Sequence, residues 1–274
     1  MASYTEESLP SWSQFLERLH QLRVEHEGLK AARPGVPPLL FRGHNDSSWQ
    51  LATTLERYGK RSLSLLTYYR AISAARPEIE AYTGREWEIE GVPEYAAKAR
   101  DSDAGFSLMT APPAYAYMAY LRHHGFPSPL LDWTRSAHVA AYFAFKEASE
   151  TRGHAAIFVY REHIGRGKGG SVGRPAIDVR GPYVRTHRRH FVQQCQYTVC
   201  SVFREGEWHY AAHEEVIAAG GNPEQDQFWK FILPLSERQR VLRYLDEYNL
   251  NAYSLFGSEV ALMEMVAARA LLDR

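Results

Sequence analysis

Cysteine is scarce in this sequence, and long apolar runs are missing. Only Cys195 and Cys200 occur among the 274 residues, which is too few for a disulfide framework. A second thiol pair that would complete a zinc site is lacking, so we expect reduced, structural thiols and no bound metal. No run of 18 apolar residues exists, so no membrane span is expected. Residues 1–7 lack the basic and apolar regions of a secretory signal, and a cytoplasmic location is therefore expected.

An excess of charge of either sign is also absent. The 32 Lys and Arg residues balance the 32 Asp and Glu residues, so overall charge does not favour general binding to nucleic acid. One dense basic cluster, Arg185–His190, is compatible with a solvated face or with a surface that receives phosphates. The glycine-rich stretch 165–175 lacks the spacing of a phosphate-binding loop and is expected to be a connector.

Helical and strand patterns alternate along the chain. Ser11 is placed to cap a helix, because Gln14 follows three residues later, and the segment 1–32 is expected to be helical. Buried strands are expected at 39–42, 130–133, 155–160, 176–179, 197–203 and 227–233. Further helices are expected at 62–82 with an interruption at Pro77, at 114–124 and 139–145, and at 237–248 and 259–272, capped by Ser236 and Ser258.

The segments between these elements are expected to lie at the surface. Residues 43–60 have a loop pattern in which Trp49 and Leu51 are expected to pack inward, and residues 84–110 are polar and acidic. The mixture of helices and strands predicts an α+β fold with a mixed β-sheet core, and the whole chain, 1–274, is expected to form one domain.

Two short segments carry the most specific information. Phe41-Arg42-Gly43 ends an apolar strand, and His123-His124-Gly125-Phe126-Pro127-Ser128-Pro129-Leu130-Leu131-Asp132-Trp133-Thr134 ends a second one. Together they resemble the motifs of the FRG domain family. The chain departs from the family's second motif where His123 replaces Gln and where Ser128-Pro129 replaces Thr-Arg.

The resemblance implies a particular chemistry. The order of strands and helices is similar to that of ADP-ribosyltransferases, in which a strand Arg and a later Ser or Thr bind NAD as the substrate. Arg42 and Thr134 match those two positions. A planar guanidinium suits the NAD diphosphate, and cleavage of the nicotinamide–ribose bond builds positive charge that a preorganised oxygen stabilises.

A third catalytic position remains open between three residues. The family pattern Arg-x-x-x-Gln-x-Gly-x-Phe corresponds here to residues 189–197, so Gln193 matches the family Gln while Cys195 replaces Gly and Tyr197 replaces Phe. Glu207 and Glu259 compete for the role. We favour Gln193, because it precedes a strand that is expected to border the site, although an amide supplies no charge.

Other candidate residues have a structural interpretation beside the functional one. We expect Arg42, His124, Asp132, Trp133 and Thr134 to line one NAD-binding cleft, because polar groups at strand ends usually line a site. Equally, Arg42 is a candidate for a buried ion pair with Asp132, and His124 and Trp133 are candidates for core residues. His209 and His213 have the spacing of a shared helix face, but without the Glu of a zinc-protease motif no zinc is expected.

Two functions follow. The first is an NAD-dependent ADP-ribosyltransferase or NAD glycohydrolase that acts as a toxin or effector in bacterial conflict or phage defence, with a protein or nucleic-acid acceptor and an antitoxin or trigger protein as partners. The second is a non-catalytic module that uses the same cleft to bind a nucleotide, nucleic acid or protein. The converging strand ends favour the enzyme, and the lack of a clear catalytic Glu favours the module.

Overall fold

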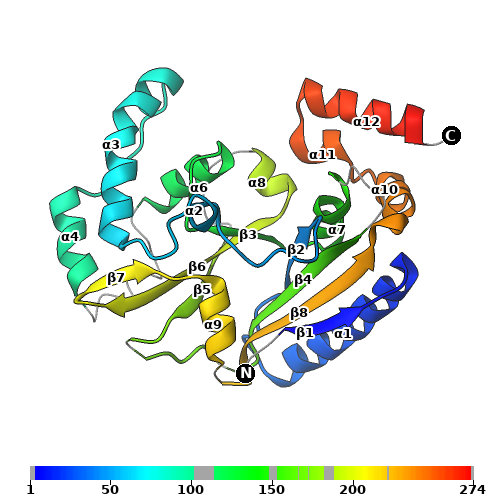
Figure 1. Cartoon of the computed structure of the whole chain (residues 1–274), viewed down its shortest axis with the longest axis horizontal. Coiled ribbons are helices and arrows are strands. Elements are labelled where there is room, and N and C mark those ends of the chain that lie inside the picture. Colours follow the sequence, from blue (N-terminus) through cyan, green and yellow to red (C-terminus); the bar gives the residue numbers. More distant parts are fainter. Residues whose placement is uncertain are drawn as a thin grey trace.

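One β-sheet runs through the molecule, and helices cover most of it (Figure 1). The computed structural model describes residues 4–101, 114–147, 153–165, 167–171, 173–181, 188–220 and 222–272. Its strands are β1 (Thr5–Ser8), β2 (Leu40–His44), β3 (Leu131–Thr134), β4 (His154–His163), β5 (Ala176–Arg180), β6 (Cys195–Arg204), β7 (Glu207–Tyr210) and β8 (Gln225–Pro234). The mixed α+β fold that the sequence predicts is confirmed.

The eight described strands follow the order β1-β8-β4-β2-β3-β6-β5, and β7 pairs with β6 outside this path. The β1–β8 pair is parallel, and the other described pairs are antiparallel. Strand β4 pairs with β8 over nearly its whole length and with all five residues of β2. By contrast, β2 meets β3 at one recorded register pair, Phe41 opposite Thr134. Strand pairing is therefore sparse between β2 and β3, near the middle of the sheet, where the two strands diverge.

Helices surround this sheet on both faces and at its ends. The described helices are α1 (Trp12–Ala32), α2 (Thr54–Arg57), α3 (Leu65–Thr83), α4 (Val92–Arg100), α6 (Tyr115–His123), α7 (Ala137–Phe145), α8 (Arg188–Val192), α9 (His213–Ala219), the 3-10 turn η1 (Leu235–Glu237), α10 (Arg238–Glu247), α11 (Ala252–Phe256) and α12 (Glu259–Leu272). None of the helices within the described ranges is long and apolar enough to cross a membrane.

Two apolar clusters share one face of the sheet. The first joins α1, α7 and α10 to the strands around β4 and β8, and the second joins α3, α4 and α6 to β6. A third cluster, on the opposite face, contains Trp133, Phe158 and Tyr160. Figure 1 shows α3, α4 and α6 at one end of the sheet and α10, α11 and α12 near the other. On the face that the first two clusters share, the junction between β2 and β3 lies between them.

Gly43 lets α7 lie directly on β2. A Cβ atom at Gly43 would stand 1.9 Å from the carbonyl oxygen of Ala140 and 2.6 Å from the amide nitrogen of Ala144. Since real Cβ atoms do not approach backbone so closely, a side chain here would force the helix away from the strand. The glycine of the Phe-Arg-Gly motif thus fixes the distance between β2 and α7.

Several local predictions are confirmed. Ser11 caps α1, with its hydroxyl accepting from the Gln14 amide, and Ser258 accepts from the Ala261 amide at the start of α12. Helix α6 covers most of the expected helix at 114–124, and Gly125 after it has a left-handed backbone with φ of 88°. Leu51 is fully buried.

Other local predictions are wrong. Helix α3 continues through Pro77 because Ile72 before it is buried and Ile79 after it packs on the same cluster, which outweighs the lost hydrogen bond. Trp49, which is expected to pack inward, is instead 48% exposed.

Four boundaries also differ from the predictions. Residues 5–8, within the segment 1–32 that is expected to be helical, form the strand β1, and residues 54–57, within the loop pattern of 43–60, form the helix α2. Part of the expected excursion at 84–110 is helix α4, which packs through Tyr95 and Ala99, whereas 102–110 lies outside the described residues. Ser236 lies inside η1 and caps nothing, because the tight turn precedes α10.

Candidate functional site

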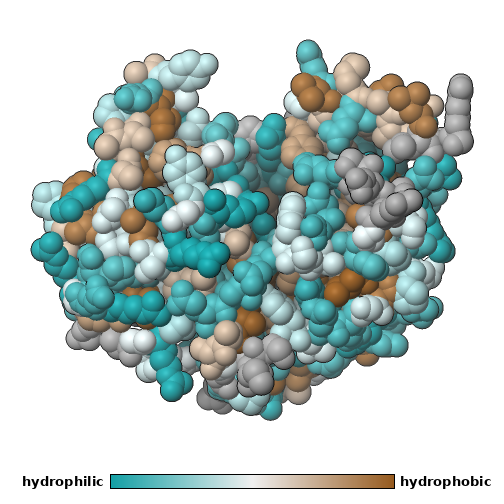
Figure 2. Space-filling view, viewed as in Figure 1, coloured by the Kyte–Doolittle hydropathy of each residue, from teal (hydrophilic) through white to brown (hydrophobic). Residues whose placement is uncertain are grey.

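A cavity of about 810 Å³ opens at the β2–β3 junction. Beyond the Phe41–Thr134 pair no further register is recorded between the two strands, and the side chain of Arg42 occupies the gap. Figure 2 shows the molecular surface hollowed between the projection formed by α3 and that formed by α11 and α12. The cavity is lined by Phe41, Arg42, Gly43, His44, Asn45, Ser48, Trp49, Gln50, Ala52, Arg57, Arg122, His123, Asp132, Trp133, Thr134, Val139, Ala140, Phe143, Lys146, Glu147, Arg189, Gln193, Cys195 and Phe256.

Arg42 is held by two hydrogen bonds. Its Nη1 donates to the backbone oxygen of Asp132 at 2.6 Å, and its Nε donates to Nε2 of His44 at 2.9 Å. No described acceptor is recorded for Nη2, so the guanidinium keeps donors for a ligand. Burial lowers the pKa of Arg42 to about 10, against the opposing charge of Asp132, so the side chain remains a cation at neutral pH.

His44 holds Arg42 as a neutral acceptor. Burial, followed by the charge of Arg42, lowers the pKa of His44 to about 3. The imidazole is therefore unprotonated at Nε2, which lets it accept the Arg42 Nε–H bond. A positively charged histidine here would repel the guanidinium and supply no acceptor.

The expected ion pair between Arg42 and Asp132 is wrong in one respect. The Asp132 carboxylate pairs with Arg122, in the last turn of α6, and Arg42 uses the Asp132 backbone instead. The reason is geometric. Alternation along the strands places Arg42 with Leu40 on one face of the sheet, whereas Asp132 points to the α6 face. Oδ1 of Asp132 is buried and has no partner among the described residues.

Thr134 and Gln193 are connected to each other. The Thr134 hydroxyl donates to the Gln193 backbone oxygen at 2.7 Å and accepts from the Ser136 amide at 3.0 Å. The Gln193 amide group donates to the Leu255 backbone oxygen at 3.1 Å, while its Oε1 accepts a weak bond from the Cys195 thiol at 3.7 Å. Both residues line the cavity, and together they link β3 to α11: Thr134 bonds to Gln193, and Gln193 bonds to Leu255.

Trp133 is mainly a core residue. It is 2% exposed, and its ring packs against Tyr160 and Phe228. The indole Nε1 donates to the Thr198 hydroxyl at 2.8 Å. Although part of Trp133 lines the cavity, its ring is not presented as a stacking surface.

Three candidate residues lie outside the cavity lining. His124 is exposed at the end of α6, with its ring 4.2 Å from that of Tyr120. Glu207 lies on β7, 3.7 Å from His209, and Glu259 is exposed at the start of α12. The shared helix face predicted for His209 and His213 is wrong, because His209 is in β7 and His213 begins α9.

Basic side chains outnumber acidic ones around the cavity. The lining holds Arg42, Arg57, Arg122, Arg189 and Lys146, against the carboxylates of Asp132 and Glu147. Arg57, Arg122 and Lys146 were not predicted as site residues, since nothing in the pattern around Arg57 or Lys146 marks a site. Arg122 had the clearest signal, because it directly precedes the His123–Thr134 motif.

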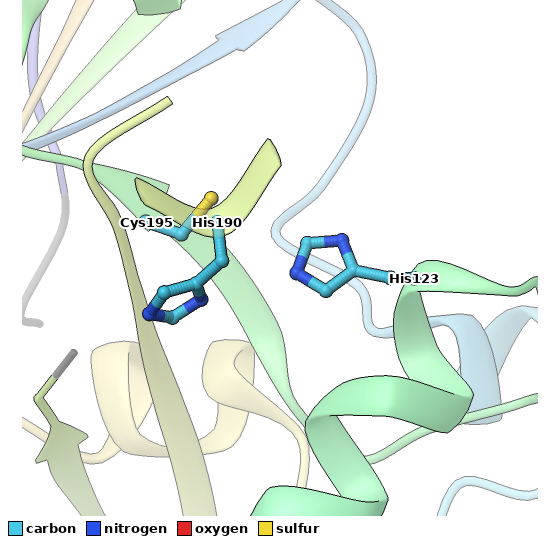
Figure 3. A group of neighbouring side chains, drawn as sticks. All are labelled: His123, His190 and Cys195. Atoms are coloured by element: carbon cyan, nitrogen blue, oxygen red, sulfur yellow. The ribbon is translucent and has the colours of Figure 1, made fainter. Parts of the chain in front are cut away.

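A possible metal-binding group lies in the cavity wall. One potential ligand atom from each of His123, His190 and Cys195 falls within 4.8 Å of the other two (Figure 3). Sequence spacing gave no sign of this group, because its members come from α6, α8 and β6.

Comparison with known proteins identifies part of the chain. Residues 37–153 match the family model of the FRG domain, whereas no curated protein and no solved structure matches. The matched segment contains β2, β3 and α6, which supply Arg42, Arg122, Asp132 and Thr134 to the cavity. The likeness to ADP-ribosyltransferases stays a prediction. The chain therefore contains an FRG domain, whose family model covers residues 37–153.

Proposed function

We propose that the cavity binds a nucleotide through its phosphates and that NAD is the substrate. The observation that carries this proposal is the basic excess around Arg42, with five cationic side chains against two carboxylates in one cavity. A cavity of about 810 Å³ is within the usual size of cofactor sites, roughly 300–1,000 Å³. Guanidinium groups suit phosphate oxygens because they donate several bonds in one plane.

Arg42 and Arg57 are the cations with donors to spare. Arg42 keeps its Nη2, and the exposed side chain of Arg57 has no hydrogen bond or ion pair recorded with a described residue. Arg122 differs, because it is already paired with Asp132. In this proposal Arg42 and Arg57 hold the diphosphate, and the partly exposed ring of Trp49 at the cavity rim offers a surface to a base.

The reaction we propose breaks the nicotinamide–ribose bond of NAD. The bonding electron pair leaves with the nicotinamide nitrogen, which becomes neutral, and positive charge builds on the ribose. An acceptor oxygen or nitrogen, from water or from a macromolecule, then forms the new bond to the ribose carbon and loses its proton. The developing charge requires an oxygen nearby.

Gln193 and Asp132 are the groups proposed to meet that requirement. Among the described residues the Gln193 Oε1 receives only the weak thiol bond, so its amide oxygen can accept from a ribose hydroxyl. Asp132 supplies the negative charge that an amide lacks, and its Oδ1 has no described partner. Thr134 orients Gln193 by bonding to its backbone.

A non-catalytic binding module is the second candidate. The observation in its favour is that Thr134 and Gln193 are engaged in protein hydrogen bonds, while Glu207 and Glu259 lie outside the lining. The same basic cavity would then hold a nucleotide, nucleic acid or protein without cleaving NAD.

Calorimetric titration of the full chain with NAD, followed by product analysis, tests the proposal. Losing one charge-assisted bond costs about 1.5–3 kcal/mol, so Arg42→Ala should weaken NAD binding roughly 10- to 150-fold. Arg42→Lys should fail as well, because an ammonium does not reproduce the forked contact. Arg204→Ala, at the far end of β6, is the matched control.

The outcomes separate the two candidates. Release of nicotinamide by the wild type, lost in Arg42→Ala, supports the enzyme, and labelled NAD with cell extract then shows whether protein, nucleic acid or water is the acceptor. Tight NAD binding without nicotinamide release supports the module. If neither NAD nor ADP binds, or if Arg42→Ala binds as the wild type does, the nucleotide proposal is wrong.

The proposed biological role is that of a toxin or effector in bacterial conflict or phage defence, with an antitoxin or trigger protein that controls it. This role rests on the FRG resemblance and on the proposed NAD consumption. Controlled expression should then lower cellular NAD and arrest growth for the wild type but not for Arg42→Ala. Growth arrest with unchanged NAD would contradict the proposed mechanism.

A further inference from the structure

Three metal-ligating side chains converge beside the cavity. His123 ends α6, His190 lies in α8 and Cys195 begins β6. One potential ligand atom from each falls within 4.8 Å of the other two. Figure 3 shows that the three side chains come from separate elements and that the His123 ring points toward the other two residues. Each of these residues belongs to a different helix or strand, so the arrangement does not result from local chain geometry.

Tyr197 marks the centre of this group. Its hydroxyl lies 2.7 Å from Nε2 of His123 and 3.2 Å from Nδ1 of His190. Each of these bonds occupies one ring nitrogen, so a metal ion would bind through Nδ1 of His123 and Nε2 of His190. Tyr197 faces the same side of β6 as Cys195, because the two are separated by one residue.

We propose that His123, His190 and Cys195 bind one Zn²⁺ ion. Two imidazoles and a thiolate are the nitrogen and sulfur ligands that Zn²⁺ prefers, and three protein ligands with an open fourth position are typical of a reactive zinc site. Tetrahedral bonds of about 2.0–2.3 Å place ligand atoms roughly 3.3–3.6 Å apart. The ligand atoms, now within 4.8 Å of one another, would need to move by about 1 Å to reach this separation. The thiol proton leaves to solvent when the ion binds.

The open position would face the cavity. His123 and Cys195 line the cavity that contains Arg42, whereas His190 is 5% exposed and lies behind them. A water molecule or an anionic group of a bound ligand would complete the tetrahedron from the cavity side. The Tyr197 hydroxyl, which bonds both histidines, would orient them from the protein side.

The members of this group also stand out in the sequence. His123, Cys195 and Tyr197 are positions at which the chain departs from the FRG motifs, and all three meet at His190. The competing explanation is a hydrogen-bonded cluster without metal, held by Tyr197 and by the Cys195–Gln193 contact. Metal binding distinguishes the two, and it does so independently of whether NAD binds.

Zinc titration of the metal-free full chain against a chelating indicator is the test. The wild type should bind one equivalent of Zn²⁺. Replacing an outer residue that orients a ligand weakens metal affinity about 10- to 100-fold, so loss of a ligand in Cys195→Ala or His190→Asn should cost more than about 100-fold. Tyr197→Phe should lie within the 10- to 100-fold range. Cys200→Ala is the matched control, since its thiol lies in the opposite apolar cluster.

Cobalt substitution reports the ligand type directly. The Co²⁺-loaded wild type and Cys200→Ala should show a thiolate-to-cobalt charge-transfer band that Cys195→Ala lacks. Circular dichroism confirms that each variant is folded. The proposal is overturned if the folded wild type binds no Zn²⁺, if the Co²⁺ protein has no charge-transfer band, or if Cys195→Ala retains wild-type affinity. The wild-type measurements decide the matter even if a ligand variant fails to fold.

Discussion

Acidification should destabilise this protein because His213, a buried histidine at the start of α9, resists protonation in the folded state. The Trp133 indole donates to the Thr198 hydroxyl, whose oxygen lies 2.6 Å from Nε2 of His213. The Thr198 hydroxyl accepts from the indole and can donate its own proton to Nε2 of a neutral His213. Burial, then the charges of Arg42 and Lys168, lowers the pKa of His213 to about 3.

The size of the effect follows from proton linkage. An unfolded histidine has a pKa of about 6.5, so below that pH the unfolded chain takes up a proton that the folded chain refuses. His213 therefore stabilises the fold fully above about pH 6.5, and this contribution is lost as the pH falls toward 3. At about pH 5 the loss is roughly 1.5 pH units times 1.4 kcal/mol, or about 2 kcal/mol.

Urea unfolding at about pH 7.5 and about pH 5 measures this loss. His213→Gln keeps an acceptor for Thr198 but does not titrate, so its free energy of unfolding should fall by about 2 kcal/mol less than that of the wild type. The exposed His20→Gln is the control and should behave as the wild type does. The pKa of His44 is also about 3, but its contribution is common to all three proteins and cancels. An equal loss in His213→Gln and the wild type would refute the reasoning.

Three further changes test the packing. Gly43→Ala should destabilise the protein by about 3 kcal/mol, the upper end of overpacking costs, because the new Cβ meets the Ala140 backbone; an unchanged urea midpoint would contradict the close contact. Pro77→Ala should stabilise it by about 1–3 kcal/mol, because Pro77 is exposed within a continuous helix, and thermal unfolding should show the rise. Arg122→Ala should destabilise it by about 1–3 kcal/mol, since a partly buried carboxylate loses its partner, while the exposed Arg57→Ala should change stability by less than about 0.5 kcal/mol in the same assay.

Features set by neighbouring residues could be predicted from the sequence. Ser11 and Ser258 cap helices through hydroxyls that act within three residues, and the apolar runs of β3 and β4 are continuous enough to identify strands. The two FRG motifs also located the strand ends that line the cavity.

Features set by distant contacts could not be predicted. The partner of Asp132 depends on where α6 places Arg122, and strand alternation sends Arg42 to the other face. Pro77 stays within α3 because packing on both sides of it holds the helix. The group of His123, His190 and Cys195 exists only after α6, α8 and β6 have come together. The spacing of these three residues along the chain therefore does not indicate that they come together.

The pairing of β4 with β8 has a consequence for synthesis of the chain. Residues 155–161 of β4 are all buried, and β8 begins about 60 residues after β4 ends. At 5–20 residues per second, a ribosome needs on the order of ten seconds to supply that partner. During this interval β4 presents an unpaired apolar edge, the kind of segment that joins other chains. Nascent chains that stop before residue 225 should therefore aggregate or require a chaperone, whereas completed chains cover the edge themselves.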